Sequence, residues 1–419
     1  MTLKTIEVLN YKCLRYTRQQ LRPFQILVGP NASGKSTFLD VLVFLQDLVC
    51  DGLQKAVQKR ARSVHELIWR RLYGRFEIVV ELPIPEKLRE RLPGHSLLRY
   101  EISVGTNEQE VLSVLTENLW FVRAGANSDH RATTRRPTLF PQEVQPPPFI
   151  VHTPRKRTPP GYRKVMSRTA DGRVYVRSET TNWYFPLTIG RDRVGLTYIP
   201  EEFERFPASL WLKRLLSEQV HFLMLNSQAM RWPCRPDAPR TLLPDGSNLA
   251  LVVENLQKDP KQFQLWVDHL QTVLPHIKNI TVEERQEDRF KYLVVVTNDE
   301  TRLPSWVLSD GTLRLFAMTL IAYVPEEKGI YIIEEPETGI HPHAIESVYQ
   351  SLSSIYDGQV FCATHSPIFL NLAKPEELLC FALTESGATD IVPGDTHPRL
   401  REWKAEVPLG DLLASGILG

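Results

Sequence analysis

The sequence predicts an α/β fold in which most strands of the core sheet are parallel. In the last third of the chain, short apolar strands alternate with helices, and strands without polar positions are typical of a parallel sheet covered on both faces. Near the start, an apolar strand, a glycine-rich loop and a helix follow one another. There is no internal repeat and no sustained heptad pattern, so neither a repeat architecture nor a coiled coil is expected.

The composition is that of an ordinary globular protein with several lobes. The 419 residues are 42% hydrophobic and 24% charged, and 50 Lys and Arg against 49 Asp and Glu leave a net charge of +1. Any affinity for nucleic acid must therefore come from a local patch. The five cysteines form no Cys-x-x-Cys pair, which disfavours structural zinc and suits a reducing cytoplasm. No run resembles a signal peptide or a membrane span, so we expect a cytoplasmic protein without a membrane partner.

The N-terminal elements follow from simple periodicity. Residues 3–9 alternate apolar and polar side chains as a half-buried strand does, and residues 25–28 indicate a short buried strand. Apolar side chains then recur at helical spacing over residues 37–49. Residues 76–82 and 98–104 indicate two further strands, which we expect to be antiparallel.

The middle of the chain changes in composition. Residues 123–177 contain twelve Lys or Arg against three acidic residues, with clustered prolines, and predict a loop-rich basic insertion. Later helices are expected at 210–225, 247–258, 263–274, 312–323 and 343–356, and strands at 292–297, 329–333 and 359–363. The predicted parts are an N-terminal lobe (1–119), a basic insertion or lid (120–230), a helical subdomain (231–304) and a C-terminal lobe (305–419).

The glycine-rich loop has the residues of a phosphate-binding loop (P-loop). Its two glycines let the backbone approach a phosphate closely, and the following helix N-terminus attracts negative charge. Lys35 would reach the β- and γ-phosphates, and the Ser36 hydroxyl would bind Mg²⁺. The predicted nucleotide contacts are Gly29, Asn31, Ser33, Gly34, Lys35, Ser36 and Thr37. The alternative, a glycine turn with an accidental lysine, does not explain the strand and helix on either side.

Acidic residues end the apolar strand at 329–333. A buried parallel strand delivers such residues to the crevice in which ligands bind. Glu334 can contact Mg²⁺ through its water shell, and Glu335 is placed to orient or polarise the attacking water. The alternative is a pair of solvated acids at a strand exit. Glu337 lies beyond Pro336, and we interpret it as structural.

Two further segments have the chemistry of phosphate contacts. Residues 308–312 (LSDGT) supply a hydroxyl, free amides and a helix N-terminus, although a plain helix cap would look the same. The predicted strand 359–363 is followed by Thr364 and His365. A lone histidine is more often structural, but the spacing of this one after the acidic pair and its Thr-His-Ser-Pro context favour a functional role.

In combination, these segments resemble the ABC ATPase superfamily, whose signature begins Leu-Ser-Gly-Gly; Asp310 replaces the first glycine here. The resemblance implies that Ser309 and Gly311 cap the γ-phosphate bound by the opposite subunit and that His365 is the switch histidine. The string EEPETGIHP at 334–342, DGSNL at 245–249 and the closing residues 409–416 resemble the stand-alone ATPases of the RecF/OLD-like branch.

The resemblance implies an ABC-type ATPase head, with mixed antiparallel and parallel sheets, flanking helices, a basic proline-rich insertion and a helical subdomain. It also implies an ATP- and Mg²⁺-dependent hydrolase, with Glu335, His365 and Lys35 as catalytic groups and Ser36 and Glu334 as metal contacts. ATP would drive the formation of a homodimer or a higher oligomer. A separately encoded effector, such as a nuclease, would then act in anti-phage defence or DNA maintenance. The long coiled coil of SMC relatives and the nuclease domain of OLD relatives are not in this sequence.

Two other interpretations remain open. The chain could be a DNA-binding module with a regulatory nucleotide site, since residues 123–177 are basic and Tyr162, Tyr175, Trp183 and Tyr184 lie within or near them. The same window could be a solvated loop or a docking surface for an acidic partner. A nuclease is disfavoured because no Asp-x-Asp or histidine-rich cluster follows the motifs. Neither Gln46 nor Gln54 has the context of a glutamine loop.

Overall fold

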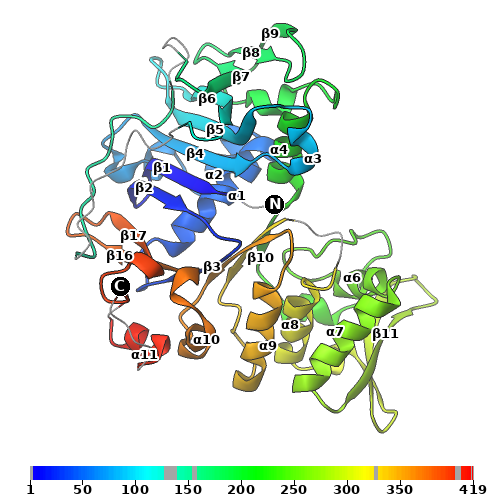
Figure 1. The fold of residues 1–419 in the computed structure, drawn as a ribbon. Helices are drawn as coiled ribbons and strands as arrows, with labels where there is room; N and C mark the ends of the chain where they lie inside the picture. Colours follow the sequence, from blue (N-terminus) through cyan, green and yellow to red (C-terminus); the bar gives the residue numbers. More distant parts are fainter. Residues whose placement is uncertain are drawn as a thin grey trace.

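The computed structural model describes residues 3–126, 139–152, 158–324, 329–401, 407–416 and 418. Two large sheets lie one above the other in Figure 1, with helix α1 (Lys35–Asp51) between them. The apolar side chains of α1 belong to one core together with residues of both sheets. This arrangement confirms the predicted α/β class with mixed antiparallel and parallel sheets.

The upper sheet in Figure 1 has eight strands, and every neighbouring pair is antiparallel. In spatial order its strands are β2 (Leu14–Gln20), β1 (Thr5–Tyr11), β4 (Arg75–Pro83), β5 (His95–Thr106), β6 (Leu112–Arg123), β7 (Tyr162–Arg168), β8 (Arg173–Arg177) and β9 (Tyr184–Thr188). The predicted strands at 3–9, 76–82 and 98–104 correspond to β1, β4 and β5.

The lower sheet has six strands and is parallel apart from its last strand. In spatial order its strands are β10 (Val220–Leu223), β14 (Ile330–Glu334), β15 (Gln359–Ala363), β3 (Phe24–Val28), β16 (Leu378–Leu383) and β17 (Thr389–Pro393). Side chains of a strand alternate between its faces, and Phe361 packs in the α1 core whereas Val360 and Cys362 pack in a second core. Both faces are therefore buried, which explains why these strands lack polar positions.

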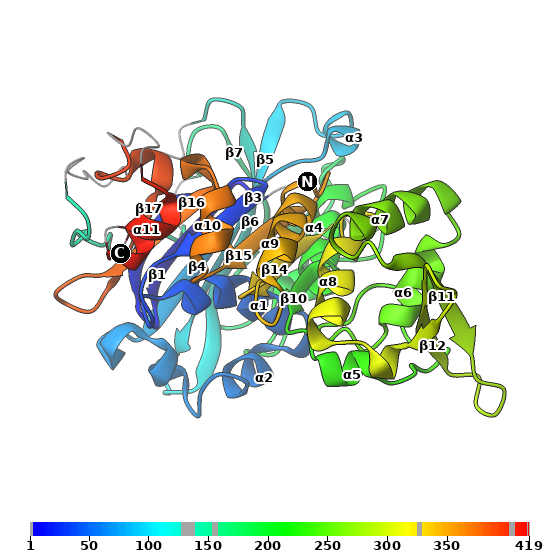
Figure 2. The same cartoon turned by 90° about the horizontal axis from the view of Figure 1, so that it is seen from below.

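The second core lies under a helical layer. Figures 1 and 2 show α8 and α9 beside the parallel strands, on the side away from the antiparallel sheet. The longer helices are α4 (Pro207–Glu218), α6 (Leu249–Leu256), α7 (Pro260–Val273), α8 (Asp310–Leu320) and α9 (Pro342–Ser353). The shorter ones are α2 (Leu53–Gln58), α3 (Glu86–Arg89), α5 (Ser227–Arg231), α10 (Pro367–Leu372) and α11 (Leu409–Ala414). A three-stranded antiparallel sheet, β11 (Ile277–Glu284), β12 (Lys291–Thr297) and β13 (Arg302–Pro304), completes this part.

Two expectations about secondary structure are wrong. The helix predicted at 210–225 ends at Glu218, because Val220–Leu223 instead pairs with β14 as strand β10. The basic window contains β7 and β8, which extend the upper sheet where loops were expected. In β8, buried valines alternate with exposed Arg and Tyr side chains, the period-2 pattern of a half-buried strand. The boundary predicted between residues 119 and 120 falls inside β6, so the N-terminal sheet continues into the predicted insertion.

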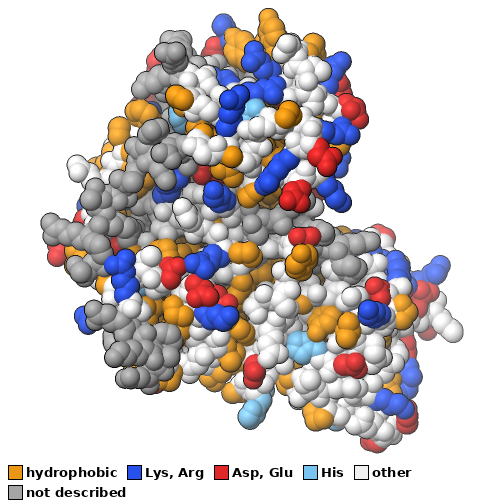
Figure 3. All heavy atoms as spheres, in the orientation of Figure 1, with side chains coloured by type: hydrophobic (Ala, Val, Ile, Leu, Met, Phe, Trp, Pro, Cys, Tyr) orange, Lys and Arg blue, Asp and Glu red, His pale blue; other side chains and the backbone are white. Residues whose placement is uncertain are grey.

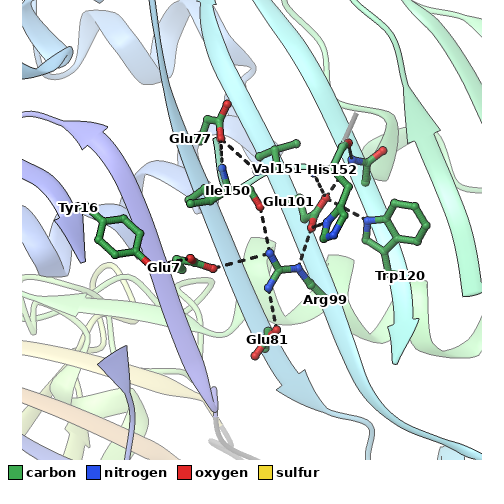
Figure 4. Close-up of polar contacts among 11 residues, drawn as sticks. Glu7, Tyr16, Glu77, Glu81, Arg99, Glu101, Trp120, Ile150, Val151 and His152 are labelled. Atoms are coloured by element: carbon green, nitrogen blue, oxygen red, sulfur yellow. Dashed lines mark hydrogen bonds and ion pairs between the residues drawn. The ribbon is translucent and has the colours of Figure 1, made fainter. Parts of the chain in front are cut away.

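Residues 139–152, which belong to the connection from β6 to β7, lie on the outer face of the upper sheet and are called the strap here. Figure 4 shows the strap held by buried charged side chains. The Glu77 carboxylate accepts hydrogen bonds from the amides of Ile150 (2.6 Å) and Val151 (3.1 Å), and Glu101 accepts one from His152 (3.0 Å). The strap is thus attached through side chains of β4 and β5, although it forms no strand of its own.

A single guanidinium, that of Arg99, lies among three buried carboxylates of the upper sheet. Arg99 binds Glu101 at 2.7 Å and Glu81 at 2.8 Å, and its Nη2 lies 3.7 Å from Glu7. At its other end the strap contacts the β16–β17 hairpin, where the Gln142 amide donates to Asp390 over 2.9 Å. The strap therefore connects the outer face of the upper sheet to the edge of the lower sheet.

Candidate functional site

The predicted site residues follow three adjacent parallel strands. In the lower sheet, Glu334 on β14 is level with Ala363 on β15, and Ala363 is level with Leu27 on β3. The segments that carry Glu335, His365 and Gly29 hence leave the sheet at the same edge. In parallel sheets this carboxyl edge is where ligands bind. The fold thus brings together the loop, the acids and the histidine, which are far apart in sequence.

The glycine-rich loop, residues 29–34, is closely packed from behind by β16 and β17. Gly29 has a φ of 147°, and a Cβ added to it would lie 2.2 Å from the carbonyl oxygen of Phe381. Gly34 has a φ of 103°, and its Cβ would lie 2.3 Å from the Thr389 hydroxyl. That hydroxyl also donates to the Ser33 carbonyl over 2.9 Å. Both glycines are therefore required by backbone conformation and by packing.

Lys35 begins α1 and lies inside the loop. Its Nζ donates to the carbonyls of Gly29 and Pro30, each over 2.8 Å, and the residue is 7% exposed. Burial lowers the pKa of Lys35 to about 8, and the nearby carboxylates of Glu334 and Glu335 oppose this effect. The lysine is thus within electrostatic reach of both acids that the sequence assigned to the same site.

The remaining loop residues present polar groups. Asn31 and Ser36 are exposed, and Thr37 is half-buried. Ser33 is buried, and its hydroxyl has no hydrogen-bond partner among the residues that the structure describes. The first amides of α1 also lack partners within the helix, as in any helix N-terminus. These donors and the positive end of the helix suit an anion.

Both acids at the end of β14 are exposed. The Glu335 amide donates to the Ala363 carbonyl over 2.7 Å, which extends the β14–β15 ladder by one residue. Glu335 then takes a positive φ of 50°, and its Oε2 accepts a hydrogen bond from the Thr338 hydroxyl over 2.9 Å. A cavity of about 400 Å³ adjoins both acids and is also lined by Arg314 on α8. Sequence reasoning missed Thr338, whose place three residues after Glu335 is typical of a turn.

His365 lies beyond β15, between the loop lysine and the acids. Its side chain is exposed, whereas the preceding Thr364 is fully buried. Partial burial and the charge of Lys35 lower the pKa of His365, and Glu335 opposes them. The imidazole is therefore kept neutral at lower pH than a free histidine, and can donate or accept a hydrogen bond.

The signature segment, residues 308–312, forms the N-terminus of α8. The Ser309 hydroxyl accepts the Thr312 amide over 3.1 Å as an ordinary cap. A Cβ on Gly311 would lie 2.5 Å from the Gly339 carbonyl, so packing alone already requires this glycine. Asp310, where the superfamily signature has glycine, is held by Arg231 of α5 at 2.6 Å. The negative charge of Asp310 is therefore paired with the Arg231 guanidinium at this candidate anion site.

The signature faces a different cavity from the acids. This second cavity, of about 610 Å³, is lined by residues such as Ser309, Thr312, His341 and His343. It shares no lining residue with the cavity at Glu334 and Glu335. The signature contacts and the acidic contacts therefore open onto separate spaces in one chain.

Other candidates are accounted for by structure. The Gln46 side chain donates to the Val220 carbonyl over 2.8 Å and so fastens α1 to β10. Gln54 lines a separate cavity with residues of α2 and the β5–β6 hairpin. Within the described ranges, no group of three His, Cys, Asp or Glu side chains is placed to hold a metal on its own. A divalent ion here would need phosphate oxygens to complete its ligands.

Comparison with protein families gives matches for two segments of the chain. Residues 174–371 match the family described as "AAA domain, putative AbiEii toxin, Type IV TA system", and residues 1–90 match the family described as "AAA ATPase domain". Comparison with curated proteins found no match. The chain thus carries two segments similar to AAA-type ATPase domains.

Among solved structures, the chain is similar to an SMC head bound to the C-terminal winged-helix domain of ScpA, with 11% identity, 94% of this chain and 97% of that chain covered, and a TM-score of 0.51. The SMC head of Pyrococcus furiosus bound to the C-terminal domain of ScpA matches with 11% identity, 93% and 95% coverage and a TM-score of 0.45. The SMC head of Thermotoga maritima matches with 13% identity, 94% and 99% coverage and a TM-score of 0.40.

The first of these similarities shows that the fold is that of an ABC-type ATPase head, as predicted. The finer assignment to the RecF/OLD-like branch stays a prediction. In the part of the chain that the structure describes, no helix is both long and apolar enough to span a membrane.

Proposed function

We propose that this chain is a Mg²⁺-dependent ATP hydrolase that works as a head-to-tail dimer. The observation that carries the proposal is the meeting of Lys35, Glu335 and His365 at the carboxyl edge of three adjacent parallel strands. The matches to AAA-type ATPase families support the same reaction.

The residues present fit a triphosphate and a magnesium ion. The unpartnered Ser33 hydroxyl, the loop amides and Lys35 supply donors to phosphate oxygens. Ser36 and Glu334 offer the oxygen ligands that Mg²⁺ prefers. Both are exposed: Ser36 directly follows Lys35 of the loop, and Glu334 ends β14 at the carboxyl edge of the sheet. When bound, the ion would neutralise charge on the phosphoryl oxygens.

The proposed roles of the side chains follow from their charges. Lys35 neutralises phosphate charge, which requires it to leave the carbonyls of Gly29 and Pro30 for the ligand. Glu335 is exposed and held by Thr338, so it can orient a water and accept its proton. His365, neutral and exposed, can donate a hydrogen bond to a developing phosphoryl oxygen.

A second copy would complete the site. Ser309 and Gly311 line a cavity other than that of Glu335, and this supports the inference that the signature of one chain serves the nucleotide of another. ATP would then hold two subunits together, and hydrolysis would release them. Because a similar SMC head is bound to a partner protein and one matched family is described as a toxin, we propose that the dimer controls a separate effector, in phage defence or DNA maintenance.

The test is Glu335→Gln, which keeps the shape of the side chain and removes its base. We expect ATP binding to be retained, hydrolysis to fall by about 100-fold or more, and an ATP-dependent dimer to accumulate. The matched control is Glu376→Gln, because Glu376 is also exposed but lies in the turn before β16. Turnover of Glu335→Gln at the parent rate would show that the assigned role is wrong.

The second candidate function is nucleic-acid binding, favoured by a cluster of basic residues at one end of the upper sheet. The register places His95 beside Arg123, and Arg163 and Arg177 also lie at this end. Figure 3 shows Lys and Arg side chains on the surface of the upper part of the molecule, which contains this sheet. The window residues Arg131, Arg135, Arg136, Arg155, Lys156 and Arg157 lie outside the described residues.

A salt series tests this second function. If the parent binds duplex DNA, its affinity should fall steeply with salt, and Arg123→Gln with Arg177→Gln should weaken binding and reduce the slope by about 2. Arg285→Gln, on the opposite lobe, is the control. A flat salt response would remove the DNA function and leave the proposed ATPase untouched.

A further inference from the structure

Glu337 connects the two loops that carry Glu335 and His365. The chain turns sharply after β14: the Thr338 amide donates to the Glu335 carbonyl, and the Ile340 amide to the Glu337 carbonyl, each over 3.0 Å. The two carboxylates of this turn have different partners. That of Glu335 is bound by Thr338 within the turn, whereas that of Glu337 is bound by the neighbouring loop beyond β15.

The contacts of Glu337 are with the residues around the histidine. The Thr364 hydroxyl donates a hydrogen bond to Glu337 Oε1 over 2.6 Å, and the backbone amide of His365 is near enough to lower the pKa of this carboxyl. Thr364 itself is fully buried, and its hydroxyl accepts the Ser366 amide over 3.0 Å. The Thr364 hydroxyl thus links Glu337 to Ser366, on either side of His365.

On either side of residues 364–366 the chain is held by regular structure. The Thr364 amide donates to the Leu27 carbonyl of β3 over 3.3 Å, and Ser366 caps α10. Within the described residues, Glu337 is the side chain that joins this turn to the acidic turn. Without it, the ladder bond from the Glu335 amide to the Ala363 carbonyl would still join the two loops. The Glu337 contact adds a side-chain bond that holds the chain beyond Ala363 against the acidic turn.

The partial burial of the Glu337 carboxylate is energetically unfavourable. Its Oε2 is buried and has no hydrogen-bond partner in the part of the chain described. Burial raises the pKa of Glu337, the hydrogen bond from the Thr364 hydroxyl and the nearby His365 amide lower it, and the charge of Glu335 raises it again. A residue that only filled space could be apolar here, as its neighbour Cys362 is, at less cost.

We propose that Glu337 is a positioning residue that sets His365 relative to Glu335, through its hydrogen bond with the Thr364 hydroxyl. The inference rests on the proposed function, since it assigns Glu337 to the same hydrolysis. It differs from the interpretation of Glu337 as merely structural, because it predicts a loss of turnover without a loss of nucleotide affinity.

The first experiment compares Glu337→Ala with Glu337→Gln. The alanine variant loses the hydrogen bond from Thr364, and we expect its kcat for ATP to fall by about tenfold or more while KM and ATP affinity change by less than about twofold. The glutamine variant keeps an acceptor oxygen at the Oε1 position, so its kcat should stay within about threefold of the parent. Thermal unfolding of both variants reports any loss of structure.

The second experiment approaches the same bond from its donor. Thr364→Val removes the hydroxyl at nearly constant volume and should reproduce the kcat loss of Glu337→Ala, whereas Thr364→Ser keeps the hydroxyl and should hydrolyse ATP near the parent rate. This pair decides the question if Glu337→Ala fails to fold. Equal activity of Thr364→Val and Thr364→Ser would overturn the proposal.

Three further outcomes separate this inference from the proposed function. If the parent does not hydrolyse ATP, the proposed function fails and this inference with it. If the parent is active and Glu337→Ala matches it, only the positioning role fails. If Glu337→Gln is as inactive as Glu335→Gln, the carboxylate acts in the chemistry itself, and a positioning role is again wrong.

Discussion

Glutamates on the upper sheet are buried and paired, whereas the two glutamates that end β14 in the lower sheet are exposed. Glu101 is 0% exposed and is bound by Arg99, His152 and the Trp120 indole. Although burial opposes it, Arg99 and His152 hold the pKa of Glu101 down at about 2. In the lower sheet, Glu335 receives one hydrogen bond, from a threonine hydroxyl of its own turn.

The contrast shows how one residue type serves two purposes. The buried carboxylates are bound by the strap, by Arg99 and by neighbouring side chains such as the Trp120 indole, so they fix structure and have little bonding capacity left for a ligand. The exposed carboxylates stabilise little, and their oxygens are accessible to water and to a metal ion. A carboxylate that is buried and fully hydrogen-bonded is therefore structural, whereas one that is exposed and has few partners is available for function.

The largest expected effect on stability is from Arg99→Met. It leaves three carboxylates buried without their cation, so the free energy of unfolding should fall by about 3–5 kcal/mol in urea titrations. Glu335→Gln in the same assay should change it by less than about 0.5 kcal/mol. A small effect of Arg99→Met would show that the strap network is not what holds the outer face of the upper sheet.

The pH dependence of stability tests the same network. The folded pKa of Glu101, about 2, is below its ordinary value, so its ionisation stabilises the fold above that ordinary value, and this contribution is lost as pH falls toward 2. The contribution amounts to about 3 kcal/mol at neutral pH. The stability difference between the parent and Glu101→Gln should therefore shrink between pH 6 and pH 3; a constant difference would contradict the assignment.

A smaller effect is expected from the strap side of the network. His152→Ala removes the 2.6 Å contact of Nδ1 with Glu101 but leaves Arg99 in place. Unfolding should be easier by about 1 kcal/mol, and limited proteolysis within residues 139–152 should be faster. Unchanged cleavage would mean that the ring does not help to hold the strap.

The candidate site was more predictable from sequence than the upper sheet. Its residues lie in short continuous motifs, and such motifs can be recognised without knowledge of the fold. The strand, glycine loop and helix around Lys35 are confirmed, and strand 359–363 lies where predicted. The buried network has no such signal: Arg99 and its partner Glu81 alternate with apolar residues, a pattern that usually indicates a solvated strand face. These side chains are buried because the strap covers them, and Ile150 of the strap, which accepts a hydrogen bond from Arg99, is fifty-one residues away from it in sequence.

Other features were hidden for the same reason. Strands β7 and β8 are short and basic, and their pairing partners rather than their composition define them as strands. The support of Gly34 by Thr389 joins residues from opposite ends of the chain. Neither can be read from a local window, because the sheet that creates the contact is assembled only in the fold.

The central claim is that two chains share each nucleotide site, and mixing two defective variants tests it most directly. Lys35→Ala should destroy the phosphate loop of its own chain, and Ser309→Arg should block the nucleotide of its partner, so each variant alone should be inactive in ATP hydrolysis. Half of randomly mixed dimers would pair the two variants, and each of these would hold one intact site, so the mixture should recover about a quarter of parent activity. A mixture that stays inactive, or Ser309→Arg that hydrolyses ATP like the parent, would contradict the account.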